Sequence, residues 1–148
     1  MSTTAIFVPP IVLANNDYDR LSAIANSACR RENAIGYFLA EEITRARVVA
    51  PAEVAPSVVT MNSQVEFMDD QTGQVRRMKL VYPEHADILH DRISVLTPVG
   101  AALIGLSEGQ SMQWKTRQGK SKSLTVLKVH FQPERSLDAA SIKSALGT

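Results

Sequence analysis

The spacing of apolar residues changes partway along the chain, and this change limits the folds open to it. Between residues 18 and 46 apolar side chains recur at helical spacing, whereas from residue 65 onward they alternate as in a strand. Pro51 and Pro56 lie between the two parts and disfavour a continuous helix there. The sequence therefore predicts an α+β protein, with a helical N-terminal part followed by a β-domain.

The helical part is predicted to be a short antiparallel hairpin. Its two apolar stripes consist of Tyr18, Leu21, Ala25 and Ala28, and of Ile35, Leu39, Ile43 and Ala46. Residues 15–17 offer caps for a first helix that ends near Arg31, and Asn33 is the predicted cap of the second helix. The apolar residues 7–13 around a proline pair predict an extended lead-in or an edge strand. We expect residues 1–50 to form this lead-in and hairpin.

The second part, residues 57–132, is predicted to be an antiparallel β-domain with one short helix. Alternating residues 64–68 and 75–82 flank the turn residues 69–73, which is typical of a β-hairpin. Further strands are expected over 93–96, around residues 112–114 and over 124–131, with a bulge where the apolar period slips between Val126 and Leu127. Thr97 and Pro98 predict a helix start, because a hydroxyl cap precedes proline at the first helical position, and Gly105 predicts its end. Residues 133–148 are expected to form a tail that is partly disordered.

Composition narrows the classes of function. The chain has 148 residues and a net charge of +1, so its overall field does not favour nucleic acid. No apolar run reaches the roughly 18 residues of a membrane span. The apolar residues 5–14 lack a preceding basic residue and contain a proline pair, so we expect no targeting segment, no membrane partner and a cytoplasmic protein. Cys29 is the only cysteine and cannot form an internal disulfide, which suggests a reducing compartment; a packed thiol is favoured over a reactive one.

Three segments carry a resemblance to a known family: residues 58–63 (VVTMNS), 80–87 (LVYPEHAD) and 93–109 (ISVLTPVGAALIGLSEG). Together they resemble the C-terminal domain of bacterial Gre transcript-cleavage factors, over roughly residues 15–132. Within that superfamily the chain is most similar to the short-armed regulators of nucleoside diphosphate kinase. The resemblance implies an FKBP-like β-domain behind the hairpin. It also implies docking at the rim of the secondary channel of RNA polymerase, with the hairpin directed towards the channel and at most indirect contact with nucleic acid. The implied docking unit consists of Ile93, Ser94, Thr97, Pro98, Val99 and Gly100.

The predicted hairpin tip departs from the Gre pattern. In Gre factors a long coiled coil carries acidic residues that help to hold a catalytic metal, and this chemistry needs both reach and carboxylates. Here each predicted helix has about 15 residues, or about 22 Å. The tip residues Arg30, Arg31 and Glu32 offer one carboxylate beside two arginines. We therefore expect a regulator that competes with Gre factors without stimulating cleavage, and that is not an enzyme and needs no cofactor or metal.

One loop contains residues that ligate metals in other proteins. His85, Asp87, His90 and Asp91 lie within seven residues and could bind zinc or another divalent cation. Metal sites draw their ligands from fixed structure with a supporting shell. A solvated loop near the partner surface is therefore the favoured interpretation of this candidate site.

Two further patterns lie close together near residue 120. Residues 119–121 (GKS) match the end of a phosphate-binding loop, but Trp114 stands where a leading glycine is required, so a hairpin turn is favoured. The basic run of Lys115, Arg117, Lys120 and Lys122 could meet acidic groups of the polymerase or nucleic-acid phosphate. A solvated strand-turn face is the commoner meaning of such a run.

Two other classes of function stay open. An FKBP-like fold raises the hypothesis of a peptidyl-prolyl isomerase, whose pocket needs several aromatic walls. Phe67, Tyr82, Trp114 and Phe131 are available for such a pocket, but the alternation of residues predicts that most of them face the core. The third hypothesis is a structural or dimerising module without a polymerase partner, and the oligomeric state stays open with it.

Overall fold

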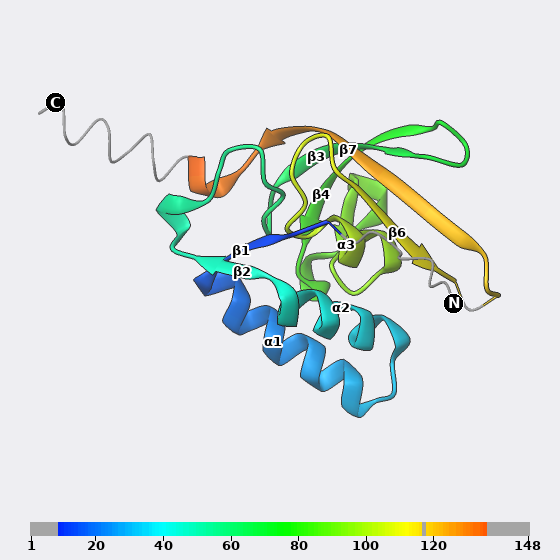
Figure 1. Ribbon diagram of the computed structural model, residues 1–148, viewed down its shortest axis with the longest axis horizontal. Helices are drawn as coiled ribbons and strands as arrows, with labels where there is room; N and C mark the ends of the chain where they lie inside the picture. Colours follow the sequence, from blue (N-terminus) through cyan, green and yellow to red (C-terminus); the bar gives the residue numbers. More distant parts are fainter. Residues whose placement is uncertain (1–8, 117, 136–148) are drawn as a thin grey trace, which may run out of the picture.

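The structure, a computed structural model, describes residues 9–116 and 118–135 and shows a helical hairpin beside a curled sheet (Figure 1). In chain order the helices and strands are β1 (Val12–Ala14), α1 (Asn15–Arg30), α2 (Ala34–Arg45), β2 (Arg47–Val49), β3 (Gln64–Asp69), β4 (Val75–Val81), β5 (Arg92–Ser94), α3 (Pro98–Leu103), β6 (Ser111–Lys115) and β7 (Ser121–Phe131). Short 3₁₀ turns lie at Pro51–Glu53, Pro83–His85 and Ile88–His90. The predicted α+β class, with a hairpin followed by a β-domain, is confirmed.

The hairpin forms where the two apolar stripes predict it. The side chain of Asn33 accepts hydrogen bonds from the backbone N–H groups of Ile35 (2.8 Å) and Gly36 (3.4 Å), so the predicted cap of α2 is present. A Cβ atom on Gly36 would lie 2.5 Å from the Cβ of Ala28, so only glycine permits this close approach of the helices. The predicted side-chain cap of α1 is absent, because Ala14 holds the N-cap position and makes no side-chain hydrogen bond.

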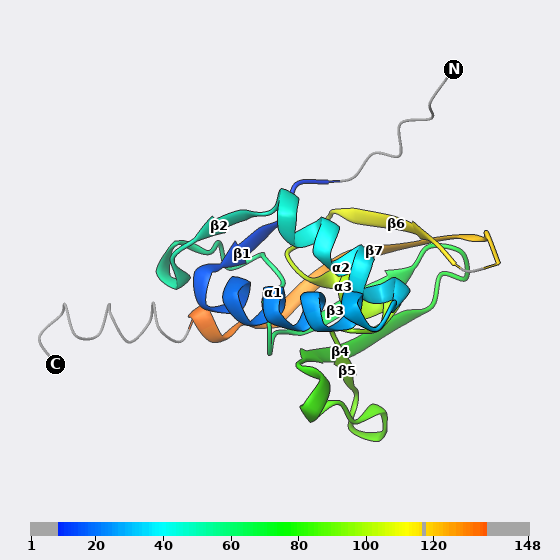
Figure 2. The ribbon, with the colours of Figure 1, turned by 90° about the horizontal axis from the view of Figure 1, so that it is seen from below.

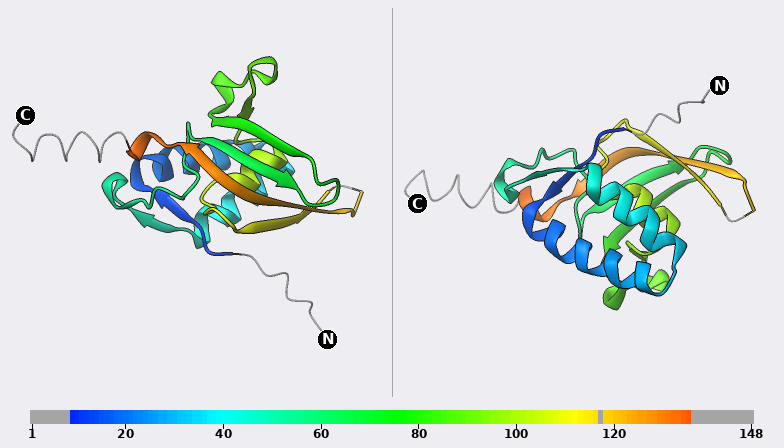
Figure 3. Two further views of the ribbon diagram at one scale, coloured as in Figure 1. Left: turned by 90° about the horizontal axis from the view of Figure 1, so that it is seen from above. Right: turned by 60° about the horizontal axis from the view of Figure 1, so that its bottom comes forward.

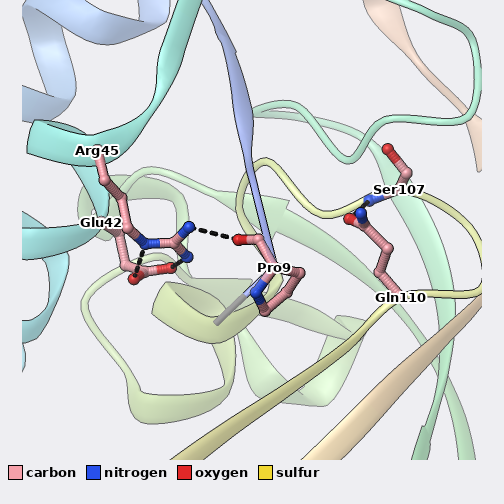
Figure 4. Close-up of polar contacts among 5 residues, drawn as sticks. All are labelled: Pro9, Glu42, Arg45, Ser107 and Gln110. Atoms are coloured by element: carbon pink, nitrogen blue, oxygen red, sulfur yellow. Dashed lines mark hydrogen bonds and ion pairs between the residues drawn. The ribbon is translucent and has the colours of Figure 1, made fainter. Parts of the chain in front are cut away.

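The lead-in is a strand with a partner that the sequence did not reveal. β1 pairs in parallel with β2, which immediately follows the hairpin. Figure 4 shows how this end is fastened: the Arg45 guanidinium donates two hydrogen bonds (2.9 and 2.7 Å) to the buried carboxylate of Glu42 and a third to the carbonyl of Pro9. In the same view Gln110 Oε1 accepts from the Ser107 N–H at 2.9 Å and closes the turn before β6.

The large sheet has the strand order β5-β4-β3-β7-β6. Neighbouring strands of this sheet are antiparallel, as predicted, except that β5 runs parallel to β4 and makes the sheet mixed. A parallel neighbour requires the chain to return towards the start of β4 before it pairs, and residues 82–91 make this return, whereas a tight hairpin would give an antiparallel pair. The predicted bulge is confirmed: Glu66 pairs with Lys128 and Phe67 with Val126, which leaves Leu127 without a partner.

α3 packs between α2 and the strands β6 and β7, as the views in Figures 2 and 3 show. Thr97 Oγ1 accepts a hydrogen bond from the Gly100 N–H at 3.0 Å, and Pro98 occupies the first helical position, as predicted. Side chains from the hairpin, such as Leu21 and Leu39, share one buried cluster with sheet residues such as Leu80. The hairpin is therefore packed on the β-domain and is not a free arm.

The end of the described chain returns to the β-domain. The buried side chain of Gln132 donates to the carbonyls of Ala55 (2.9 Å) and Val58 (2.8 Å), and the buried Glu134 accepts from Thr60 Oγ1 at 2.7 Å. The remainder of the predicted tail, residues 136–148, lies outside the described residues. Among the helices that the structure describes, none is long and apolar enough to span a membrane.

Candidate functional site

A cleft of about 1120 Å³ lies between the hairpin tip, α3 and the sheet. The tip contributes Arg31 and Glu32, and the start of α3 contributes Pro98 and Val99. From the sequence we assigned these residues to two separate candidate sites, the hairpin tip and the docking unit. The fold brings both to one cleft, which no local pattern in the sequence indicates.

The cleft has an apolar floor. Phe67 and Leu124 are buried beneath it, while four lining side chains are half-buried and pack against the core. These four are Ile35, Phe38, Val99 and Trp114.

The charged side chains that line the cleft are mostly basic. Arg31, Arg76 and Lys115 are exposed and Lys122 is half-buried. Within the described residues, none of these four forms an ion pair. Lys115 and Lys122, which belong to the basic run that we interpreted as a solvated strand-turn face, both line the cleft.

The six residues of the docking unit fall into two groups. Ile93 and Gly100 are buried, and a Cβ atom on Gly100 would lie 2.0 Å from the Ser94 carbonyl oxygen. Thr97 Oγ1 donates to that same carbonyl at 2.7 Å while it caps α3. Pro98 is exposed and Val99 is half-buried. The buried members therefore fix the backbone, Pro98 is the exposed member, and Pro98 and Val99 are the two members that line the cleft.

The hairpin tip is held in a compact turn. The N–H groups of Arg31 and Asn33 donate to the Ala28 carbonyl (3.1 and 3.0 Å), and Glu32 adopts a left-handed backbone with φ 56°. Arg30, Arg31 and Glu32 are all exposed. In Figure 1 the strands β6 and β7 extend further along the long axis of the molecule than this tip does. The tip thus lies beside the sheet.

The histidine-containing loop after β4 projects from the body of the protein (Figure 3, left). His90 Nδ1 lies 2.6 Å from Asp87 Oδ2, and this hydrogen bond lowers the pKa of Asp87 below its ordinary value. In the part of the chain that is described, no three His, Cys, Asp or Glu side chains gather as metal ligands would. Between His85 and His90 the loop instead presents Ile88 and Leu89, of which Leu89 is 89% exposed.

A buried polar cluster joins the start of α1 to the β-domain. The Asp17 carboxylate accepts from the Tyr82 hydroxyl (3.1 Å) and from the Met61 N–H (3.4 Å). The Arg20 guanidinium lies 3.8 Å from the centre of the Tyr82 ring and pairs with Glu84. Burial raises the pKa of Asp17 and that of Tyr82. The sequence suggested only a capping role for Asp17, because no local pattern connects it with a tyrosine 65 residues later.

The aromatic residues considered for an isomerase pocket do not gather in one place. Phe67 and Trp114 line the cleft, whereas Tyr82 is buried against Asp17 and Phe131 is exposed. The GKS segment ends the hairpin turn between β6 and β7, in which Gly119 has φ 77° and its N–H donates to the Thr116 carbonyl at 2.9 Å. Arg117 of the basic run lies outside the described residues.

Comparison with known proteins matches both halves of the chain. The family model "Rnk N-terminus" matches residues 9–49, and the model "Transcription elongation factor, GreA/GreB, C-term" matches residues 52–131. The regulator of nucleoside diphosphate kinase of Escherichia coli (strain K12) is 36% identical over 130 residues, which cover 88% of this chain and 96% of that protein.

Transcription elongation factor GreA of Syntrophobacter fumaroxidans is 32% identical over 91 residues, which cover 62% of this chain and 58% of that factor. The solved structure of a GreA/GreB elongation factor from Nitrosomonas europaea superposes with a TM-score of 0.66 at 33% identity, over 83% of this chain and 99% of that one. The chain therefore belongs to the Gre family of transcription factors, in the branch that joins an Rnk N-terminus to a GreA/GreB C-terminal domain.

Proposed function

We propose that this protein binds RNA polymerase and regulates transcription without stimulating transcript cleavage. Membership of the Gre family supports the choice of partner, since the GreA/GreB C-terminal match contains the whole docking unit. The observation that carries the proposal is Pro98, which is exposed at the cleft while its neighbours Ile93 and Gly100 are buried.

The backbone at Pro98 is fixed before any partner arrives. Proline restricts φ, and Thr97 holds the preceding turn through hydrogen bonds to Ser94 and Gly100. A contact surface that is already ordered loses little conformational entropy when it binds. Pro98 and Val99 therefore suit a docking contact better than a mobile loop would.

The absence of cleavage stimulation follows from the hairpin tip. A hard divalent cation needs several oxygen ligands, and the tip presents Glu32 beside Arg30 and Arg31. α1 has 16 residues and α2 has 12, so the arm is about 24 Å long at most. The short arm, whose tip lies beside the sheet, lacks the reach that cleavage requires. The single carboxylate at the tip does not provide the ligands that the catalytic metal requires.

Competition with Gre factors is the regulatory mechanism that this arrangement supports. A protein that occupies a shared site lowers the occupancy of a competitor by mass action. At saturation, equal affinity and equal free concentration would reduce the competitor to about half occupancy.

Binding of fluorescently labelled protein to core polymerase tests the proposal. We expect Pro98→Glu to weaken binding by about tenfold or more, because it places a charge at the centre of the contact. Pro10→Glu is the matched control, since Pro10 is exposed and does not line the cleft. Unchanged affinity in a folded Pro98→Glu protein would refute the docking assignment. If the wild-type protein does not bind polymerase and forms a stable dimer, the hypothesis of a structural or dimerising module is favoured instead.

A further inference from the structure

Besides Pro98 and Val99, the cleft is lined by side chains that the proposed docking contact does not use. Its floor combines an aliphatic surface at Ile35 and Val99 with the aromatic side chains Phe38 and Trp114. These side chains come from α2, α3 and β6, so three elements meet around one apolar depression.

The side chains that line the cleft around this floor carry a net positive charge. Arg31, Arg76, Lys115 and Lys122 make no ion pair among the described residues. The acidic lining residue Asp69 already accepts hydrogen bonds from the backbone N–H groups of residues 71 and 72. Glu32 is the other acidic lining residue, so four cations outnumber two carboxylates around the cleft.

The arrangement fits a protein segment better than a small metabolite. Small-molecule sites enclose about 300–1,000 Å³ and aim a few buried polar groups at the ligand. Here the volume is about 1120 Å³, and the charged groups stand around an apolar floor. Grooves of this kind receive amphipathic segments, whose apolar side chains enter the groove while their polar side chains meet the rim.

We propose that the cleft binds a short acidic segment of a partner protein. A large apolar side chain of that segment packs between Phe38, Val99 and Trp114, and its carboxylates face the four basic residues of the rim. The proposal does not depend on polymerase binding, and its test contains no polymerase.

Trp114 provides a direct signal, because it is the only tryptophan of the chain and it lines the cleft. The probe is a synthetic peptide of about three helical turns, rich in glutamate and with two leucines four residues apart. We expect it to change the Trp114 emission saturably, with an affinity that falls as salt is added. Two control peptides, one with lysine for glutamate and one with serine for leucine, should bind at least about tenfold more weakly.

Two charge reversals locate the binding. Arg76→Glu should weaken the acidic peptide by about tenfold, while Lys128→Glu should leave it unchanged because Lys128 is exposed outside the cleft. Equal effects of the two variants, or equal binding of acidic and basic peptides, would overturn the proposal. Tighter binding of a nucleoside diphosphate than of the acidic peptide would also overturn it and would assign the cleft to phosphate ligands.

The outcomes separate this site from the proposed function. If the wild-type protein binds the acidic peptide but not polymerase, the proposed function is refuted and the cleft proposal stands. Polymerase binding without peptide binding would defeat the cleft proposal alone.

Discussion

Replacing Gly100 with alanine should disturb the backbone on which Pro98 stands. The new Cβ atom would lie 2.0 Å from the Ser94 carbonyl oxygen and 2.8 Å from its carbonyl carbon, and both are backbone atoms that cannot rotate away. An ordinary contact needs a separation greater by about 1 Å, so α3 must move away from the segment that precedes it. Overpacking of this kind costs about 1–3 kcal/mol, and the better helix propensity of alanine returns at most about 1 kcal/mol. Because a 2.0 Å approach to backbone atoms places the overpacking cost in the upper half of this range, we expect a net loss of about 1–2 kcal/mol.

Urea unfolding followed by Trp114 emission measures this loss as a lower midpoint with an unchanged slope. Binding to core polymerase should weaken at the same time, because the displaced helix carries Pro98 and Val99. Gly109→Ala is the control: its φ of 87° strains alanine, but no atom lies within 4 Å of the added Cβ. It should lose stability without losing polymerase affinity. A Gly100→Ala protein as stable as the wild type, with normal polymerase binding, would refute the reasoning.

Two further substitutions test the parts of the fold that hold the cleft in place. Asn33→Ala removes the side-chain cap of α2 and should cost about 1 kcal/mol in urea unfolding, whereas an unchanged midpoint would show that the cap is energetically silent. Asp17→Asn tests the buried carboxylate, whose raised pKa means that the folded state binds its proton more tightly than the unfolded state does. The carboxyl therefore contributes stability below its ordinary pKa of 3.8, and this contribution is lost as the pH rises through the raised value. The unfolding free energy of the wild type minus that of Asp17→Asn should accordingly fall as the pH rises above 3.8, and a constant difference would contradict the burial argument.

The elements that the sequence predicted correctly depend on neighbouring residues. Asn33 caps a helix that starts at the next residue, and Thr97 with Pro98 opens α3 through a bond to Gly100. The bulge at Leu127 follows from a slip in the alternation of one strand. Each of these features needs only a few residues, and their side-chain chemistry is sufficient to specify them.

The features that the sequence did not reveal connect distant residues. β1 pairs with β2 across the whole hairpin, and Asp17 meets Tyr82 across 65 residues. β5 was predicted as a strand, but its parallel pairing depends on the path of the loop before it. Local patterns do not encode such contacts, because packing of the complete chain decides them.

The candidate site shows the same division. The tip and the docking unit were found separately, from charge at the tip and from family resemblance at Pro98. Their union in one cleft depends on the packing of α2 against α3, and the presence of Lys115 and Lys122 there depends on the course of β6 and β7.

Transcript cleavage in backtracked polymerase complexes tests the proposed competition most directly. With a Gre factor held at a fixed concentration, this protein should inhibit stimulated cleavage in a graded manner, and additional Gre factor should relieve the inhibition. On its own it should not stimulate cleavage at a concentration that saturates polymerase. Robust cleavage by this protein alone, or no inhibition of the Gre factor at saturation, would contradict the proposal that it occupies the shared site without performing the reaction.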